Sequence, residues 1–296
     1  MILLVGATGR LGQAVAQRLN RGGIPFRAAC RTIGKSHRFA ELGTEVVAMD
    51  IATGVGMVEA LSGITKIVSC AHGLVGKSRH SILRTDVQGH AALIDAAAAS
   101  GITRFVYLSA LGASYDHPAE FWRAKAVTEK HLIASGLDYV ILRPSAFMDL
   151  YAHDLIGSAV IRKRPVVLLG DGRLSRNMIA VEDVATVVVA ACVRNDLVNE
   201  TIEIGGPESL TEREIVAQYE RLSGYKARVI CVPKIALRAM ASAIHPVHSG
   251  VARLLRLPIE LQGRDDLHLQ SMSWTERFSI VPMRLRDLAD RKMSDR

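Results

Sequence analysis

The sequence of 296 residues contains few of the side chains that mark disulfide-bonded, metal-binding or membrane-spanning proteins. Its four cysteines, Cys30, Cys70, Cys192 and Cys231, have no C-x-x-C spacing, which indicates reduced thiols rather than a disulfide framework or metal site. No apolar run approaches the roughly 18 residues of a membrane-spanning helix, and the chain opens on a strand-like segment rather than a basic leader. We therefore expect a cytoplasmic protein without a bound metal.

Aromatic residues are also scarce, at 5% of the chain, and this bears on the formal charge of +8. A basic surface attracts polyanions. Lysine and arginine are nevertheless spread from Arg10 to Arg296, and no helix-turn-helix, zinc-finger or RNA-binding pattern accompanies them. We expect no nucleic-acid partner. With 49% hydrophobic residues, the chain can instead bury the large core of an enzyme-sized globular protein.

The chain does contain a glycine-rich turn directly after its first apolar segment, Ile2–Val5. Gly6 allows a tight turn, Gly9 lets the backbone approach a pyrophosphate, and Gly12 permits close packing of a helix on the strand. A phosphate then lies at the helix N-terminus. The residues expected to contact a dinucleotide here are Gly6, Thr8, Gly9, Arg10, Leu11 and Gly12.

Short strand-like segments alternate with helical patterns through the first half of the chain. Strands are expected at Ile2–Val5, Pro25–Cys30, Glu45–Met49, Lys66–Ser69, Arg104–Leu108 and Tyr139–Leu142, and helices at Leu11–Leu19, Gly56–Leu61, Val87–Ala99 and Ala119–Ala134. This alternation predicts an α/β fold with a doubly wound parallel sheet of the Rossmann type. Its binding site should lie beyond the carboxyl ends of the strands.

After residue 150 the alternation loosens, with further strands expected at Val166–Leu169, Ile202–Ile204 and Val229–Val232. We expect residues 1–150 to bind the dinucleotide and residues 151–296 to form a smaller, intimately packed lobe on the substrate side. Asp183 is expected to cap the helix that follows it, and Thr211 with Glu214 forms a capping-box pattern.

Three residues that follow strands are candidates for contact with the cofactor. Arg31, strengthened by Lys35, is placed to pair with the 2′-phosphate of NADP, which favours NADP(H) over NAD(H). Asp50 either accepts a hydrogen bond from adenine or is an ordinary turn residue. Ala71 is small enough for a cofactor to lie across the sheet.

The chain resembles the atypical short-chain dehydrogenase/reductases, in particular the NmrA-like group with its isoflavone-reductase-like and quinone-reductase-like enzymes. The matching segments span about residues 1–215 and are Gly6–Gly12, Arg31, Phe105–Ser109, Lys125, Leu142–Pro144, Ile179–Ala185 and Ile204–Glu208. The resemblance implies that Ser109, Arg143, Pro144 and Ser145 line the cofactor site. It also implies that Lys125 hydrogen-bonds the nicotinamide ribose and acts with Ser109 in catalysis.

The chain departs from this family at the position of the usual catalytic tyrosine, four residues before the lysine, where Phe121 stands. A phenylalanine has no proton to give. Lys125 itself, if partly desolvated and near neutrality in pKa, is one alternative acid. Tyr115, Tyr151 and His153 are others. A quinone acceptor relaxes the requirement, because its reduced oxygen can take a proton from water.

Three functions therefore remain open. The chain is an NADPH-dependent reductase of a quinone or conjugated carbonyl compound, a non-catalytic NADP(H)-binding sensor or assembly factor, or, third, an enzyme like the nucleotide-sugar epimerases and dehydratases. Segments 233–244 and 251–257 have basic and apolar residues at helical spacing. They suggest a substrate lid, a homodimer or protein contact, or a membrane-surface helix, of which the membrane contact is not favoured.

Overall fold

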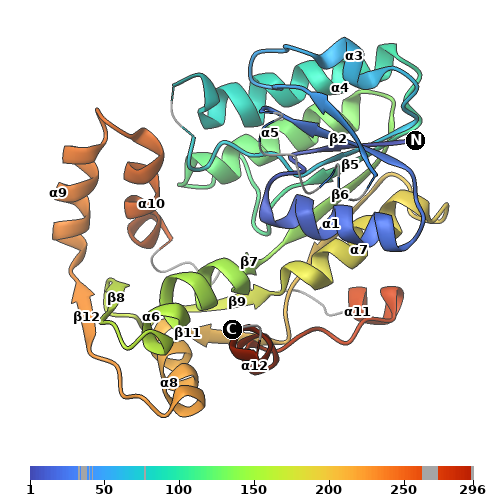
Figure 1. Ribbon diagram of the computed structural model, residues 1–296. Helices are drawn as coiled ribbons and strands as arrows, with labels where there is room; N and C mark the ends of the chain where they lie inside the picture. Colours follow the sequence, from blue (N-terminus) through green and yellow to red (C-terminus); the bar gives the residue numbers. More distant parts are fainter. Residues whose placement is uncertain are drawn as a thin grey trace. The chain divides into compact units, whose positions relative to one another are not determined.

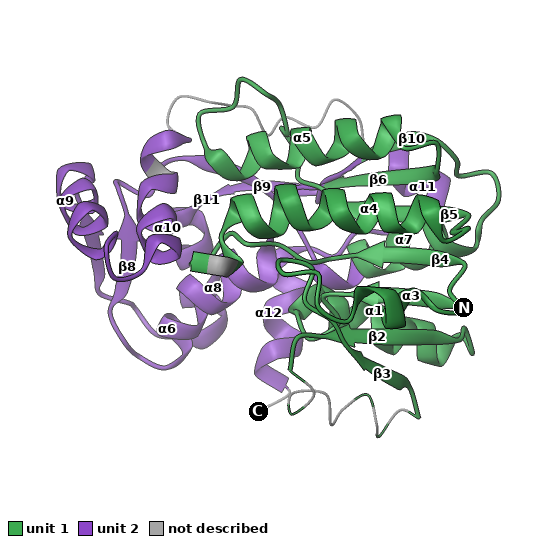
Figure 2. Ribbon diagram, turned by 90° about the horizontal axis from the view of Figure 1, so that it is seen from above, with its two compact units in different colours: residues 1–143, 184–202 green, residues 144–183, 203–296 purple. Residues whose placement is uncertain are grey.

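The computed structural model describes residues 1–32, 34, 39, 41, 43–76, 78–261 and 273–294. The proposed cofactor residue Lys35 lies outside them. The chain forms two compact units, one of residues 1–143 and 184–202 and the other of residues 144–183 and 203–296 (Figure 2). The chain therefore enters the first unit twice, whereas the sequence suggested a single boundary at residue 150.

The first unit is built on a seven-stranded sheet with the order β10-β6-β5-β4-β1-β2-β3. The strands are β1 (Ile2–Val5), β2 (Phe26–Cys30), β3 (Glu45–Ala48), β4 (Lys66–Ser69), β5 (Arg104–Leu108), β6 (Asp138–Pro144) and β10 (Glu200–Ile204). The pairs from β3 to β6 are all parallel. This order is that of a doubly wound Rossmann sheet, as predicted. Observed strand ends differ from the predicted ones by at most two residues.

Helices cover both faces of this sheet, with α3, α4 and α5 on one side and α1 and α7 on the other (Figure 1). Their bounds are α1 (Arg10–Arg21), α3 (Met57–Leu61), α4 (His90–Ala99), α5 (Glu120–Ala134) and α7 (Val181–Val193). In α1, Leu11, Val15 and Leu19 are buried. Their spacing of four residues places them on one face of the helix, which packs on the strands.

The helix expected at Val87–Ala99 begins earlier and has a different geometry over its first part. After a short 3₁₀ segment, η2 (Ser78–His80), a π-helical segment, η3 (Leu83–Gly89), leads into α4. π-Helical turns are rare and often occur at functional sites. The segment contains Asp86, which is fully buried.

The second unit contains two small sheets and several helices around its own apolar core. One sheet has the order β11-β9-β7, and the other consists of β12 and β8. The elements are β7 (Ala146–Phe147), the π-helical η4 (Asp149–Gly157), α6 (Ser158–Ile161), β8 (Val166–Leu169), β9 (Ser175–Ile179), β11 (Glu208–Thr211), α8 (Glu212–Ser223), β12 (Val229–Val232), α9 (Lys234–Ile244), α10 (Ser249–Glu260), α11 (Ser273–Phe278) and α12 (Leu285–Ser294).

Two capping predictions had different outcomes. Thr211 and Glu214 form the predicted capping box at the start of α8. Asp183 was wrongly expected to cap α7, because this helix already begins at Val181. The backbone N–H of Val181 instead donates to the carboxylate of Asp149 at 2.9 Å, so the capping group comes from a distant segment. Asp183 accepts from the backbone N–H of Met283 at 2.8 Å.

Among the described residues, the helices are all too short or too polar to cross a membrane.

Candidate nucleotide site

The strand register brings the predicted cofactor residues of the first unit to one edge of the sheet. Val5, the last residue of β1, pairs with Ala29 of β2 and Ser69 of β4, and Ser69 pairs with Tyr107 of β5. The segments that follow these strands therefore leave the sheet side by side. They carry Gly6, Arg31, Ala71 and Ser109.

The turn after β1 is built so that a side chain at Gly6 or Gly12 would not fit. Gly6 has a φ of +79°, a conformation that L side chains rarely adopt. A Cβ on Gly12 would lie 2.2 Å from the carbonyl oxygen of Gly6. Helix α1 then begins at Arg10 with neither a side-chain cap nor an acidic residue in its first turn. Its N-terminal N–H groups and dipole thus fit a phosphate.

The structure distinguishes among the other strand-end candidates. Arg31 is exposed directly after β2, and its guanidinium has no hydrogen bond or ion pair within the described part of the chain. The backbone nitrogen of Ala71 would lie 2.8 Å from a Cβ on Gly6, so Ala71 packs against the glycine turn. Asp50 makes the contacts of a turn residue, the second of the two alternatives. Its carboxylate accepts from the backbone N–H of Ala52 at 3.0 Å and contacts His80 Nε2 at 2.8 Å.

Lys125 lies at the carboxyl end of β5, inside the first unit rather than on its surface. Its side chain is only 2% exposed. The ammonium Nζ donates to the backbone oxygen of Leu108 at 2.9 Å and lies 3.2 Å from Oδ1 of Asp86. The other carboxylate oxygen of Asp86 accepts from the N–H of Gly73 at 2.7 Å. The buried carboxylate of Asp86 thus holds the ammonium of Lys125 beside Leu108, the residue that precedes Ser109.

This environment keeps Lys125 protonated. Burial alone lowers its pKa, but the nearby oxygens of Tyr107 and Asp86 oppose that effect, and the net shift of the pKa is upward. The structure therefore argues against the idea that Lys125 titrates near neutrality. It supports a fixed positive charge, which can orient a ligand or stabilise negative charge without losing its own proton.

Sequence reasoning gave no role to Asp86, Tyr107 or Thr128, which lie around Lys125. The ring of fully buried Tyr107 lies 4.8 Å from Nζ. Its hydroxyl is buried without a well-aligned hydrogen bond in the described chain. Burial raises the pKa of Tyr107 to about 12. Thr128 donates to the backbone oxygen of Asp86. One feature of the sequence could have indicated the pair of Asp86 and Lys125. Asp86 precedes a helix with few charged residues, and an acid that is buried with such a helix needs a buried partner.

His90, on α4, completes this network. Its Nδ1 lies 2.8 Å from the backbone oxygen of Thr85, which can only accept, so Nδ1 carries the proton. Nε2 then accepts from the hydroxyl of Ser69 at 2.8 Å. Burial, followed by the charge of Lys125, lowers the pKa of His90 to about 4. The imidazole is thus neutral at physiological pH.

This lowered pKa makes the stability of the protein dependent on pH. Between pH 6.5 and about 4 the unfolded chain binds a proton at His90 that the folded protein excludes, so stability falls as the pH decreases through this range. We expect His90→Gln, which cannot titrate, to show a shallower decrease in the urea midpoint from pH 7 to pH 4. Identical pH profiles for the two proteins would contradict this account.

Phe121 lies where the spacing predicted, one helical turn before Lys125 on α5. The centre of its ring lies 5.3 Å from Nζ of Lys125. The ring also makes an edge-on contact with the ring of His72, with 6.1 Å between the two ring centres. A tyrosine here would bring its hydroxyl into the neighbourhood of the lysine. The departure from the family pattern is therefore local, because the ring is present and only its hydroxyl is missing.

The remaining residues at the ends of β5 and β6 differ in their surroundings. The hydroxyl of Ser109 is buried and has no hydrogen-bond partner among the described residues, and the same is true of the Ser145 hydroxyl. Arg143 forms a two-pronged ion pair with Glu129 of α5, at 2.6 and 2.9 Å. It thus has a structural partner that the sequence did not predict. Pro144 and Ser145 begin the second unit, where Ser145 N–H donates to the Ile204 oxygen at 2.9 Å.

The alternative proton donors are engaged within the protein. The hydroxyl of Tyr115 donates to the backbone oxygen of Ala126 at 3.2 Å. In the second unit, Tyr151 donates to Glu212, and burial raises the pKa of Tyr151. His153 Nδ1 lies 2.9 Å from the hydroxyl of Tyr219. These contacts give each group a structural role.

The parallel sheet and the glycine turn at its carboxyl edge define a dinucleotide-binding α/β protein. A family model described as NAD(P)H-binding matches residues 6–195. The chain belongs to this NAD(P)H-binding family, which confirms the resemblance to NmrA-like atypical short-chain dehydrogenase/reductases.

Known relatives include both enzymes and assembly factors. The chain is 27% identical to the NAD(P)H azoreductase of Xenophilus azovorans over 78% of its own length and 77% of the relative. It is 25% identical to the photosystem II assembly factor Ycf39 of Guillardia theta, over 95% and 89% of the two chains. Its fold matches that of the NADPH-dependent quinone oxidoreductase of Escherichia coli, with a TM-score of 0.79, 22% identity and coverage of 99% and 100%.

Proposed function

We propose that this protein is an NADPH-dependent reductase that transfers a hydride to a quinone or conjugated carbonyl compound. The observation that carries the proposal is the cation of Lys125, which is paired with Asp86 and hydrogen-bonded to the backbone of Leu108. The next residue, Ser109, has a buried hydroxyl without a hydrogen-bond partner among the described residues. Both groups lie at the sheet edge where a dinucleotide binds in this family. The azoreductase relative and the quinone oxidoreductase fold are consistent with this class of reaction.

In this proposal the protein binds and orients its cofactor through groups of the first unit. The N–H groups at the start of α1 bind the pyrophosphate. The guanidinium of Arg31 pairs with a 2′-phosphate, and Lys125 and Ser109 hydrogen-bond the nicotinamide riboside. Bound NADPH supplies the hydride. Lys125 stabilises negative charge on the acceptor oxygen without donating its proton, and a quinone suits the site because water can protonate its reduced oxygens.

The alternative function is that of a non-catalytic NADP(H)-binding protein, in which the dinucleotide shapes a surface for assembly. Two observations favour it: Phe121 offers no proton, and Lys125 is almost completely covered by the protein. The Ycf39 relative, which aligns with 95% of this chain, is an assembly factor. Binding of NADPH is common to both proposals, so turnover must distinguish them.

The deciding experiment follows NADPH oxidation by absorbance with a panel of quinones and enones, after binding of NADPH has been established by fluorescence. If the protein is a reductase, we expect turnover that is about 100-fold or more lower in Lys125→Met. Removal of one group that stabilises the transition state typically lowers kcat by this factor. Tight binding of NADPH without turnover of any acceptor would favour the assembly factor instead.

The fluorescence measurement of binding also tests the proposed preference for NADPH. Removing a charged hydrogen-bonding group costs roughly 1.5 to 3 kcal/mol, or about 10- to 150-fold in affinity. We therefore expect Arg31→Ser to weaken NADPH binding by this factor and to leave NADH binding nearly unchanged. Arg21→Ser, at an exposed cation on the last turn of α1, is the matched control and should alter neither.

Phe121→Tyr tests whether the missing hydroxyl limits the range of substrates. The new phenol would lie near the ammonium of Lys125, which favours the phenolate form and so strengthens the phenol as an acid. We expect a gain of at least about tenfold in kcat with simple ketones, which need a proton donor, and little change with quinones. An unchanged kcat with both classes of acceptor would mean that the ring position is not adjacent to the substrate.

A further inference from the structure

Helices α9 and α10 form a hairpin that packs mainly on itself. Among the described elements, each of the two makes its only extensive helix or strand contact with the other. Leu237 and Ala241 of α9 and Ala252 of α10 are buried. The connection between the helices, residues 245–248, carries Val247, which is 75% exposed. The hairpin is therefore free to present its outer side to a partner.

The outer side of α9 is mainly apolar, with Ser242 as a polar member, which is unusual for a helix face in contact with water. Ile235, Ala239 and Ala243 follow one another at intervals of four residues, so they share one face, and each is exposed. Ile235 is 80% exposed, and Met240 beside this face is 44% exposed. The buried residues of α9 lie on the opposite side. The helix thus has a buried apolar side and an exposed, mainly apolar side that no described element covers.

The charges of the hairpin have a single dominant sign. Residues 234–260 contain four lysines and arginines, Lys234, Arg238, Arg253 and Arg256, against one acidic residue, Glu260. Lys234, Arg238 and Arg256 form no ion pair or hydrogen bond through their side chains within the described part of the chain. An unpaired cation at the edge of an apolar face is the pattern of a helix that binds an anionic interface.

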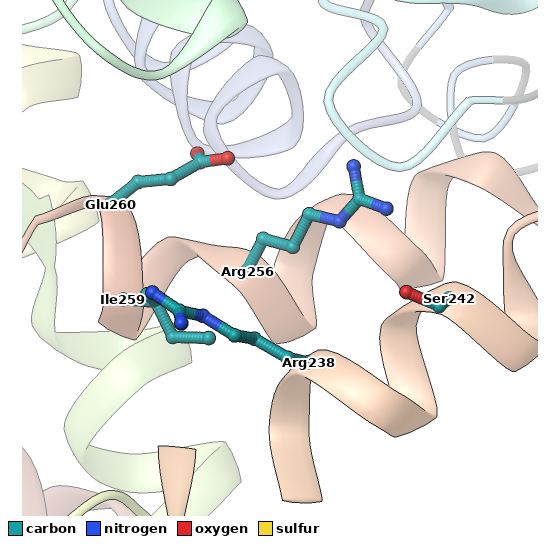
Figure 3. A pocket seen from close by; sticks show the side chains of 5 residues that line it. All are labelled: Arg238, Ser242, Arg256, Ile259 and Glu260. Carbon is teal, nitrogen blue, oxygen red and sulfur yellow. The ribbon is translucent and has the colours of Figure 1, made fainter. Parts of the chain in front are cut away.

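A cavity of about 310 Å³ lies between the two helices, and two of these cations line it. Arg238 from α9 and Arg256 from α10 line it, with the hydroxyl of Ser242 and the side chains of Ile259 and Glu260 (Figure 3). In the close-up, Arg238 extends toward Ile259, and the guanidinium of Arg256 points away from that of Arg238, so the two cations line different parts of the cavity. Guanidinium groups and a hydroxyl are donors for phosphate oxygens, and Glu260 limits the negative charge that the cavity accepts.

We propose that the α9–α10 hairpin docks on the surface of a membrane that contains anionic phospholipids. Ile235, Met240 and Val247 enter the boundary between head groups and acyl chains, and the cavity lined by Arg238 and Arg256 accepts a lipid phosphate. Such a helix lies in the plane of the interface. The docking does not depend on the proposed reductase activity, although it would bring the protein to lipid-soluble acceptors.

The chemistry of the hairpin favours a lipid surface over other occupants. A second copy would bring the same unpaired cations together, and each chain carries a formal charge of +8. Protein interfaces depend on aromatic anchors such as tyrosine and tryptophan. Residues 234–260 contain no aromatic side chain other than His245 and His248. A bilayer needs no shape complementarity, and aliphatic side chains suffice to enter it.

The test is co-sedimentation of the full-length protein with vesicles of phosphatidylcholine alone or mixed with phosphatidylglycerol. We expect binding to the mixed vesicles that is at least tenfold stronger than to the neutral ones and that weakens as salt is added, with about tenfold or greater loss in Arg238→Glu/Arg256→Glu. Ile235→Asp/Val247→Asp should lose about as much, because two aliphatic side chains no longer insert. Arg21→Glu/Lys130→Glu, which reverses two exposed cations on α1 and α5, is the matched control.

Equal binding to neutral and anionic vesicles, or no binding to either, would overturn the proposal. So would a control variant that loses as much as the hairpin variants, because net charge alone would then explain the attraction. A dimer in sedimentation velocity that Ile235→Asp/Val247→Asp dissociates would assign the face to a second copy. The salt dependence of the unmodified protein provides a test that does not rely on the folding of any variant.

Discussion

Lys125→Met is expected to lower the free energy of unfolding by about 3 to 5 kcal/mol, because it leaves the fully buried carboxylate of Asp86 without its counter-charge. Asp86→Asn alone should cost a similar amount, since it leaves the lysine unpaired. The double variant Lys125→Met/Asp86→Asn should recover most of the loss, because both charges are gone and an amide can still accept from Gly73. Urea unfolding at neutral pH measures all three differences.

An exposed ion pair offers the matched control for this experiment. Lys226 lies 2.7 Å from Glu220, closer than Lys125 lies to Asp86, but its side chain is 89% exposed. Lys226→Met should therefore change the stability by no more than about 1 kcal/mol, because water screens the pair. If the losses of the two buried single variants simply add in the double variant, Lys125 and Asp86 are not coupled, and the account of a carboxylate-held cation is wrong.

Gly12→Ala and Gly9→Ala are expected to separate the structural and binding roles of the glycine turn. A Cβ on Gly12 would lie 2.2 Å from the Gly6 oxygen and 2.8 Å from Ala7 Cα, so the backbone must move, at a cost of about 3 kcal/mol. At Gly9 the nearest atom is 3.3 Å away and the φ of −72° is ordinary for alanine. We expect this variant to keep its stability within about 1 kcal/mol.

The two variants should also differ in their binding of NADPH, measured by fluorescence titration. The added methyl group of Gly9→Ala projects where the exposed turn would approach the pyrophosphate, so binding should weaken by about tenfold or more in a well-folded protein. Gly12→Ala should lose binding only in proportion to its loss of folded protein. Unchanged affinity in Gly9→Ala would mean that the phosphates do not lie over this turn.

The sheet was predictable because parallel strands are buried on both faces and appear as short apolar runs. The turn with Gly6, Gly9 and Gly12 was predictable for a related reason. Glycines at this spacing leave room where a side chain would collide with backbone or with a bound phosphate. In both cases, the information lies within a few neighbouring residues. Strand ends differed slightly, as in β6, which extends to Pro144.

The interactions of the charged residues were not predictable, because they depend on partners from distant segments. Nothing near Arg143 in sequence indicates that Glu129 will pair with it, nor that Asp86 will meet Lys125. The capping of α7 by Asp149 is a similar case. In each case a polar group that the fold buries or partly buries is satisfied by a group from a segment distant in sequence.

The return of residues 184–202 to the first unit has a consequence for how this chain can be divided. The backbone carbonyls at the end of α7 accept from two cationic side chains that begin β4 and β5: Lys66 donates to Cys192 at 2.6 Å, and Arg104 to Arg194 at 2.6 Å. A fragment of residues 1–150 would lose these acceptors and would leave the edge of β6 without β10. Recombination that exchanges the second unit between such proteins therefore has to make several joins at once, because no single crossover transfers this unit intact.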